Sequence, residues 1–309
     1  MTGRRHCGYL PLVLGVAATV AGTAAQQPPP RFAAGTSMVS IDVLVTRDGK
    51  PVTTLTAADF DVRDSGALQT VQLSGLESIP VGLLLALDTS ASVRGPALDQ
   101  LKDAAKAAVA SLRPGDQAAL LTFSQNVALR AGWTDDKVRL QTAIDAATAQ
   151  GSTSLTDAAF AAITLPPARL SRTLALIFTD GDDSSSWLNA ATVVDAARRT
   201  DAVVYGVTLS AVASSGGTLD ERRAKLFEDP GLYRSSLLPL LSHETGGESF
   251  ARADTKDLRS VFLDVMARFN QRYVLTYAPP HAAGSGWHPV EVRMKDPALT
   301  VTARRGYTQ

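Results

Sequence analysis

Cysteine, clustered histidine and net charge are scarce in this sequence, and each scarcity excludes a class of protein. Cys7 is the only cysteine among 309 residues, so no internal disulfide can stabilise the fold. The four histidines are scattered and no Cys-x-x-Cys pair occurs, which argues against a soft-metal site. Thirty Lys and Arg residues balance thirty Asp and Glu residues, so the overall charge favours neither nucleic acid nor an anionic membrane as a partner.

Long hydrophobic runs are also absent, apart from one near the N-terminus. Arg4 and Arg5 precede the apolar stretch YLPLVLGVAATVAG, and small residues follow it near Ala25. This order is typical of a secretory signal peptide, so we expect residues 1–25 to be removed on export to the periplasm or the cell exterior. An uncleaved anchor is the alternative. No second stretch is long enough to span a bilayer, so we expect no membrane span in the mature chain.

The segments beyond the signal peptide differ in composition and in their pattern of apolar and polar residues. Residues 26–37 are rich in Pro and polar residues, as in a linker. The pattern of residues 38–79 predicts short β-strands. Residues 272–309 have the same pattern, and the last strand is expected over 299–307. Each β segment is too small to bury a core alone, so we expect the two to pair into one β module.

Between the two β segments, residues 80–271 alternate strands with helices. The stretches 81–88 (VGLLLALD) and 173–180 (TLALIFTD) are continuous apolar runs, typical of strands that are covered on both faces. Helical spacing over 95–112, over 135–150 and in later segments predicts the covering helices. We therefore predict an α/β fold with a doubly wound, mostly parallel sheet, flanked by the β module.

A long polar stretch, residues 211–234, interrupts this alternation and has room for one short helix. Insertions of this length are usually functional or mobile. We favour a mobile surface excursion over a binding loop.

Oxygen-bearing side chains gather at the expected carboxyl ends of the two apolar strands. Asp88 and Asp180 end these strands, and Ser90 and Ser92 follow at alternate positions. Thr153 lies in a later loop, GSTSLTDA, ahead of a helix. Ligands of doubly wound sheets bind beyond the carboxyl ends of the strands, so neighbouring strands would bring both carboxylates into one crevice. Two carboxylates and three hydroxyls are hard oxygen donors that suit Mg²⁺ or Mn²⁺.

Each of these residues also has an ordinary structural explanation, since Asp commonly caps helices and Ser is common in turns. The joint occurrence of all five favours the ion site. Asp182 and Asp183 could support the ion's ligands or could be solvated acids. Asp157 either orients the Thr153 loop or favours the start of a helix electrostatically. Trp187 is a candidate contact for a partner, and a packing role is the alternative.

The segment Asp88-Thr-Ser90-Ala-Ser92 resembles the D-x-S-x-S motif of von Willebrand factor A-type domains. In that family a later Thr and the Asp of a T-D-G segment complete a metal-ion-dependent adhesion site, and Thr153 and Asp180 match them in the right order. The resemblance covers the whole α/β region, and the flanking β segments look like those of exported bacterial VWFA-related proteins. It implies a Rossmann-like fold in which the five residues contact a divalent ion, directly or through water. The remaining position is left for a carboxylate from a protein partner.

Enzyme signatures are missing from the sequence. It contains no G-x-x-x-x-G-K-[ST] loop, no histidine pair with the spacing of a zinc helix and no G-x-S-x-G elbow. We therefore expect a non-enzymatic adhesion or assembly module that binds an unidentified acidic protein partner through Mg²⁺ or Mn²⁺. One alternative is a scaffold whose metal site is structural or vestigial, and a further alternative is a metal-dependent hydrolase.

Overall fold

The computed structural model describes most of the chain from Met38 onward. The described residues are 38–74, 79–165, 172–181, 183–209, 237–252, 254–279 and 286–308. Outside them lie the expected signal segment 1–25, the linker 26–37, the insertion 211–234 and Asp182. None of the described helices is both long enough and apolar enough to cross a membrane.

A six-stranded sheet forms the centre of the α/β region. Its strands, in spatial order, are β11 (Ser249–Arg252), β10 (Val203–Leu209), β9 (Arg172–Thr179), β6 (Val81–Asp88), β7 (Gln117–Phe123) and β8 (Val127–Thr134). All neighbours pair in parallel except β7 with β8. Every residue of β6 and β9 is buried, which explains why both segments are nearly continuous apolar runs.

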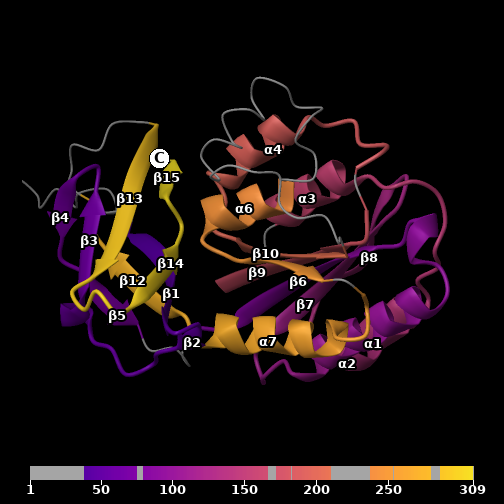
Figure 1. Cartoon of the computed structure of the whole chain (residues 1–309), viewed down its shortest axis with the longest axis horizontal. Coiled ribbons are helices and arrows are strands. Elements are labelled where there is room, and N and C mark those ends of the chain that lie inside the picture. Colours follow the sequence, from indigo (N-terminus) through magenta and orange to yellow (C-terminus); the bar gives the residue numbers. More distant parts are fainter. Residues whose placement is uncertain are drawn as a thin grey trace, which may run out of the picture. The chain divides into compact units, whose positions relative to one another are not determined.

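Helices cover both faces of this sheet (Figure 1). One face carries α1 (Pro96–Ala110), α2 (Lys137–Asp145) and α7 (Leu258–Asn270), and the other carries α3 (Leu155–Thr164), α4 (Ala190–Ala197) and α6 (Leu237–Thr245). Successive side chains of a strand point to opposite faces, so Leu83 and Leu85 of β6 pack in the first layer, whereas Leu84 and Ala86 pack in the second. The described residues also contain two short 3₁₀ helices, η1 (Ala57–Asp59) and η2 (Ala91–Val93).

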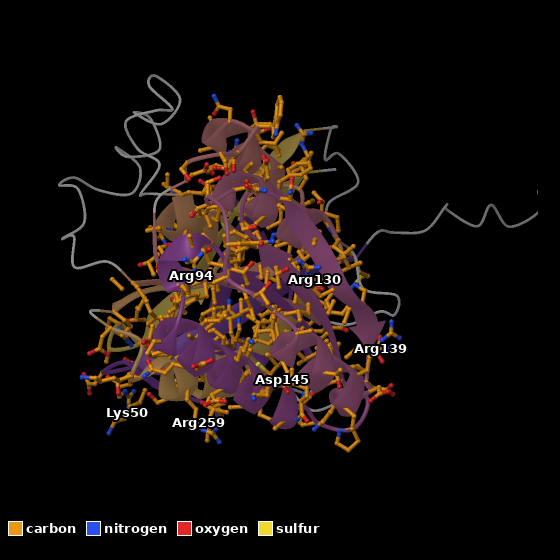
Figure 2. All side chains as sticks on the ribbon, turned by 90° about the vertical axis from the view of Figure 1, so that its right-hand side faces the viewer. Lys50, Arg94, Arg130, Arg139, Asp145 and Arg259 are labelled. Carbon is orange, nitrogen blue, oxygen red and sulfur yellow. The ribbon has the colours of Figure 1, made fainter. Side chains whose placement is uncertain are left out.

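The order of the strands defines where a ligand would bind. From β6 the chain continues to β7 on one side, and from β9 it continues to β10 on the other side. The boundary between β6 and β9 is therefore the topological switch point, beyond whose carboxyl end doubly wound sheets bind ligands. Arg94, a few residues beyond the end of β6, marks this region in Figure 2. The predicted doubly wound, mostly parallel fold is confirmed.

The two terminal β segments form a pair of antiparallel sheets. One sheet contains β14 (Thr300–Ala303), β1 (Val39–Arg47), β12 (Tyr273–Tyr277) and β5 (Gln72–Ser74), with β2 (Lys50–Pro51) paired to β1. The other contains β15 (Gly306–Thr308), β13 (Trp287–Met294), β3 (Phe60–Asp64) and β4 (Ala67–Gln69). Strands from opposite ends of the chain are direct neighbours, β1 with β12 and β3 with β13, and both sheets contribute to one core. The expected single β module is confirmed.

Two predicted elements differ from the structure. The helix expected over 135–150 spans only Lys137–Asp145, and it begins where the Asp136 carboxylate accepts hydrogen bonds from two amides of the first turn. The single strand expected over 299–307 is two strands, β14 and β15, which belong to different sheets. Between them the carbonyl of Arg305 accepts a hydrogen bond from the amide of Val290, so the chain crosses from one sheet to the other there.

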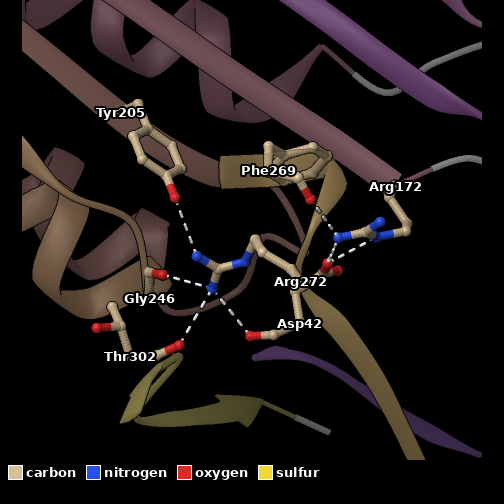
Figure 3. Close-up of polar contacts among 7 residues, drawn as sticks. All are labelled: Asp42, Arg172, Tyr205, Gly246, Phe269, Arg272 and Thr302. Carbon is tan, nitrogen blue, oxygen red and sulfur yellow. Dashed lines mark hydrogen bonds and ion pairs between the residues drawn. The ribbon is translucent and has the colours of Figure 1, made fainter. Parts of the chain in front are cut away.

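Arg272, which lies between α7 and β12, connects the β module to the α/β region (Figure 3). Its side chain is fully buried. The guanidinium donates hydrogen bonds to the hydroxyl of Tyr205 (3.1 Å) and to the carbonyls of Asp42 (3.0 Å), Gly246 (2.6 Å) and Thr302 (3.3 Å). These acceptors belong to β10, β1, the end of α6 and β14, so one side chain ties together four segments that are distant in sequence.

A second arginine reinforces the same junction. Arg172 is the first residue of β9, and its Nε donates a hydrogen bond to the Asp42 carboxylate at 2.7 Å. A terminal nitrogen of Arg172 also donates to the carbonyl of Phe269 at 3.1 Å, near the end of α7. Asp42 therefore accepts hydrogen bonds from both arginines, from Arg172 through its carboxylate and from Arg272 through its backbone carbonyl.

We predict that Arg272→Met will lower the free energy of unfolding by about 3 kcal/mol, because the substitution leaves buried carbonyl oxygens without donors. Urea denaturation of the two proteins measures this difference. Arg259→Met is the matched control, since Arg259 is an exposed arginine of α7 (Figure 2). Equal losses in the two variants would contradict a special role for Arg272.

A polar cluster also lies inside the β module. Asp64 is 3% exposed, and its Oδ2 accepts hydrogen bonds from the hydroxyls of Tyr277 (2.9 Å) and Tyr307 (2.8 Å). Ser65 donates to the other carboxylate oxygen at 3.0 Å. Burial, and then the hydrogen bond to Asp64, raise the pKa of Tyr307 to about 12, and the same two causes raise the pKa of Tyr277. The fold therefore holds both phenolic protons more tightly than the unfolded chain does.

We predict a loss of stability at alkaline pH that depends on Tyr307. The ordinary tyrosine pKa is 10.0 and the folded value is about 12, so the stabilisation is complete below pH 10 and disappears as the pH rises to about 12. In Tyr307→Phe the unfolding free energy should fall less steeply across this range, as measured by urea denaturation at several pH values. Identical slopes for the variant and the wild type would contradict the prediction.

Candidate functional site

The parallel pairing of β6 with β9 brings the two predicted carboxylates to one place. Leu87 of β6 pairs with Phe178 of β9. Asp88 is the last residue of β6, and Asp180 follows directly after β9. Both side chains therefore extend from the topological switch point at the carboxyl edge of the sheet.

A continuous network of hydrogen bonds connects four of the five predicted site residues. The hydroxyl of Ser92 donates to Oδ1 of Asp180 at 2.8 Å, and the hydroxyls of Ser90 and Ser92 lie 2.9 Å apart. The amide of Ser90 donates to Oδ1 of Asp88 at 2.8 Å. Thus hydrogen bonds connect Asp88, Ser90, Ser92 and Asp180, and the bond between Asp88 and Ser90 is donated by the Ser90 amide.

Thr153 lies beside this group but is attached to it through the backbone. The amide of Ala91 donates to the carbonyl of Gly151 at 2.9 Å, so the loop that carries Thr153 lies against the loop that carries the two serines. Gly151 has φ +76°, a conformation that favours glycine in this turn. Thr153 is 6% exposed. Among the described residues, no hydrogen bond joins its hydroxyl to the Asp88–Asp180 network.

The site is buried on one side and open on the other. Asp88 is fully buried, whereas Asp180 is half-buried and Ser92 is exposed. Burial raises the pKa of Asp88, and the charge of Asp180 adds to this rise, while hydrogen bonds from Ser90 and Thr179 oppose it. The net rise means that burial disfavours the ionised form of Asp88 more than its hydrogen bonds favour it.

Sequence reasoning missed Thr179, which completes the environment of Asp88. Its hydroxyl donates to Oδ2 of Asp88 at 2.7 Å. Each oxygen of Asp88 therefore already accepts one hydrogen bond. The available signal was a polar residue at the end of the apolar run TLALIFT, directly before Asp180.

Two acids near the site, Asp183 and Asp157, hold a loop in place by accepting hydrogen bonds from backbone amides. Asp183 is 6% exposed and accepts hydrogen bonds from the amides of Thr156 (2.7 Å) and Ser186 (3.0 Å), so the alternative of a solvated acid is wrong. Burial by itself raises the pKa of Asp183, but the bonds from Ser186 and Thr156 outweigh this effect and lower the pKa below its ordinary value.

Asp157, in the first turn of α3, accepts hydrogen bonds from the amides of Trp187 (3.0 Å) and Leu188 (2.9 Å). It therefore fixes the segment after Asp183, in addition to placing a negative charge near the start of the helix. Trp187 itself is exposed, so the packing alternative does not apply to its side chain.

The donor set is chemically simple. It offers carboxylate and hydroxyl oxygens, which hard divalent cations prefer. Within the ranges that the structure describes, no group of three or more His, Cys, Asp or Glu side chains is arranged to hold a metal ion. An ion at this edge of the sheet would therefore depend on the mixed carboxylate and hydroxyl group at the switch point.

The fold and the site together define a doubly wound α/β domain with oxygen donors at its switch point. Residues 83–182 match the family model of the von Willebrand factor type A domain. The chain therefore carries a domain of the von Willebrand factor type A family. No curated protein sequence matches the chain.

Several solved structures are similar to this chain. The D319A mutant of the PilB minor pilin from Streptococcus sanguinis has a TM-score of 0.50 at 9% identity, over 75% of this chain and 78% of that one. A von Willebrand factor type A protein from Catenulispora acidiphila has a TM-score of 0.49 at 12% identity, over 87% and 74%. Proximal thread matrix protein 1 from the mussel byssus, with a zinc-occupied MIDAS motif, has a TM-score of 0.49 at 16% identity, over 66% of this chain and 49% of that one. The chain thus spans about half the length of the mussel protein, and the pilin structure supports the fold alone.

We predict that Asp88→Asn will stabilise the metal-free protein at neutral pH. The raised pKa of Asp88 means that ionisation above the ordinary value of 3.8 opposes folding, and a neutral amide removes this cost. The amide fits the site because Thr179 can accept its hydrogen bond and direct its own proton to the carbonyl of Gly181, 3.0 Å away.

Thermal unfolding in EDTA at pH 7 should show a higher Tm for this variant than for the wild type. The gain should vanish as the pH falls below 3.8, where both proteins are neutral at this position. A lower Tm for the variant in EDTA would contradict the prediction.

Proposed function

We propose that this protein binds a partner protein through a divalent cation held at the switch point of its von Willebrand factor type A domain. The observation that supports this most strongly is the continuous network from Asp88 through Ser90 and Ser92 to Asp180. It gathers two carboxylates and two hydroxyls where the fold places ligands. The family match over residues 83–182 supports the same proposal.

The residues present fit Mg²⁺ or Mn²⁺. Ser90, Ser92 and Asp180 would hold the ion, with Thr153 contributing from the adjacent loop. Asp88 would act from the buried side, directly or through water, because each of its oxygens already accepts a hydrogen bond. Two carboxylates only balance the charge of the ion, so the bound ion supplies an electrophilic position for a further oxygen ligand.

The proposed partner presents an Asp or Glu side chain. Ser92 is exposed and Asp180 is half-buried, so the outer side of the ion would face solvent and could receive a carboxylate oxygen. The predicted signal segment 1–25 supports a role in adhesion or assembly at the cell envelope or outside the cell.

A binding role fits the site better than catalysis. Hydrolysis needs a positioned acid or base beside the reacting group. Among the described residues, the network that links Asp88 to Asp180 contains no histidine or lysine, and both of its carboxylates would be engaged by the ion.

We predict that calorimetric titration of the purified mature protein with Mg²⁺ or Mn²⁺ will show one binding site. Asp180→Asn should weaken the affinity at least about tenfold, because it removes one of two charges that face the ion, and Ser92→Ala should weaken it less. The matched control is Asp103→Asn, since Asp103 is an exposed aspartate of α1 that pairs only with a lysine of the same helix among the described residues.

Three outcomes separate the alternatives. Unchanged metal affinity in Asp180→Asn would contradict the proposed site. If metal binds but acidic peptides are retained equally with and without EDTA, the ion is structural and the protein is a scaffold. Turnover of phosphate or carboxylic ester substrates that EDTA abolishes would indicate a hydrolase instead.

A further inference from the structure

The segment from Asp183 to Leu188, which we call the Trp187 loop, is fixed to the start of α3 and to the residues just before it by several polar contacts. The carbonyl of Thr153 accepts hydrogen bonds from the amides of Ser184 (2.9 Å) and Ser185 (3.1 Å), and the amide of Thr153 donates to the Ser184 hydroxyl (3.0 Å). The hydroxyls of Ser154 and Ser185 lie 2.9 Å apart, and the amide of Asp157 donates to the Ser186 hydroxyl at 3.1 Å.

Two carboxylates complete this attachment. Asp183 accepts from the amides of Thr156 and Ser186, and Asp157 accepts from the amides of Trp187 and Leu188. Hydrogen bonds to an ionised acceptor are stronger than those between neutral groups. The backbone of the Trp187 loop is therefore held by hydrogen bonds and not by burial of its apolar side chains.

The largest side chain of this loop is left in solvent. Trp187 is 95% exposed, and the adjacent Leu188 is 37% exposed. A tryptophan can bury 150–250 Å², and this surface contributes nothing to the stability of the isolated protein. An aromatic side chain on a rigid backbone loses little entropy when a partner covers it, which is the property of energetically dominant interface residues.

The Trp187 loop lies beside the proposed ion site. Ser184 and Ser185 bind the backbone of Thr153, one of the proposed ligands. On the loop that carries Ser92, Arg94 follows that serine by two residues and is exposed (Figure 2). Among the residues that the structure describes, Arg94 has no ion-pair partner. The site is therefore flanked by an exposed apolar pair on one loop and by a positive charge on the other.

We propose that Trp187 and Leu188 form a contact surface for a protein segment in which an acidic residue is accompanied by an apolar side chain. This inference rests on the proposed function, since the acidic residue would bind the ion. The apolar neighbour would cover Trp187, and the positive charge of Arg94 would favour an acidic segment over a basic one. Selection of the partner is thereby divided between the ion, which recognises the carboxylate, and the Trp187 loop, which recognises what lies next to it.

Synthetic peptides provide the test. Short peptides with a central Glu or Asp, flanked either by Ala alone or by Leu or Phe at each neighbouring position, are immobilised and exposed to the full mature protein in Mg²⁺. The wild type should retain peptides with an apolar flank about tenfold more tightly than those with Ala, a difference of ~1.4 kcal/mol. Trp187→Ala should abolish this preference while the calorimetric affinity for Mg²⁺ stays unchanged.

Val138→Ala is the matched control, because Val138 is an exposed apolar residue of α2 outside the Trp187 loop. It should keep the full preference. If Mg²⁺ binds but Trp187→Ala keeps the preference, or if the wild type shows none, this inference is wrong and the proposed function stands. If the wild type does not bind metal, the proposed function fails, and this inference fails with it.

Discussion

The parallel pairing of β6 with β9 is the constraint on which the candidate site depends. Both strands are buried on each face, so an unpaired polar group in their middle would lose its water without compensation. Asp88 lies at the end of β6, where the hydroxyl of Thr179 and the amide of Ser90 satisfy it. Because the two strands run in the same direction, their polar ends meet at one edge of the sheet. The loop that carries Ser90 and Ser92 follows β6 at this edge.

The same network explains how the site can be ordered before an ion arrives. The buried contacts of Asp88 fix the inner side, and an ion has no need to break them. The contact between Ser92 and Asp180 lies at the exposed side, where water can replace a lost hydrogen bond at little cost. Binding an ion would thus exchange weak exposed contacts for ligand bonds and leave the strongly held inner contacts intact.

The part of the site that depends on chain order could be predicted from the sequence, and the part that depends on packing could not. Asp88, Ser90, Ser92 and Asp180 follow apolar strands in a pattern that the parallel sheet brings together. The role of Asp157 was not visible, because a carboxylate in the first turn of a helix suits the helix dipole whether or not it also binds another loop. Its bonds to the amides of Trp187 and Leu188 depend on how α3 lies against that loop.

The fold shows the same division. Alternating strand and helix patterns predicted the doubly wound sheet. Similar patterns of short strands in residues 38–79 and 272–309 predicted the β module. Arg272, in contrast, gave no signal, since an arginine after a helix is ordinarily a solvated residue. Likewise, the split of the last expected strand into β14 and β15 follows from a change of sheet and not from local propensity.

The Arg272 junction also limits how the α/β region can move. α7 packs against α1, and α1 begins shortly after Ser92. At its other end, α7 runs into Arg272, whose guanidinium is held by β10, β1, β14 and the end of α6. A shift of α7 along its axis would have to pull a fully buried charge away from these partners, which costs several kcal/mol. Arg272 therefore holds the end of α7 in a fixed position against both the β module and the α/β region.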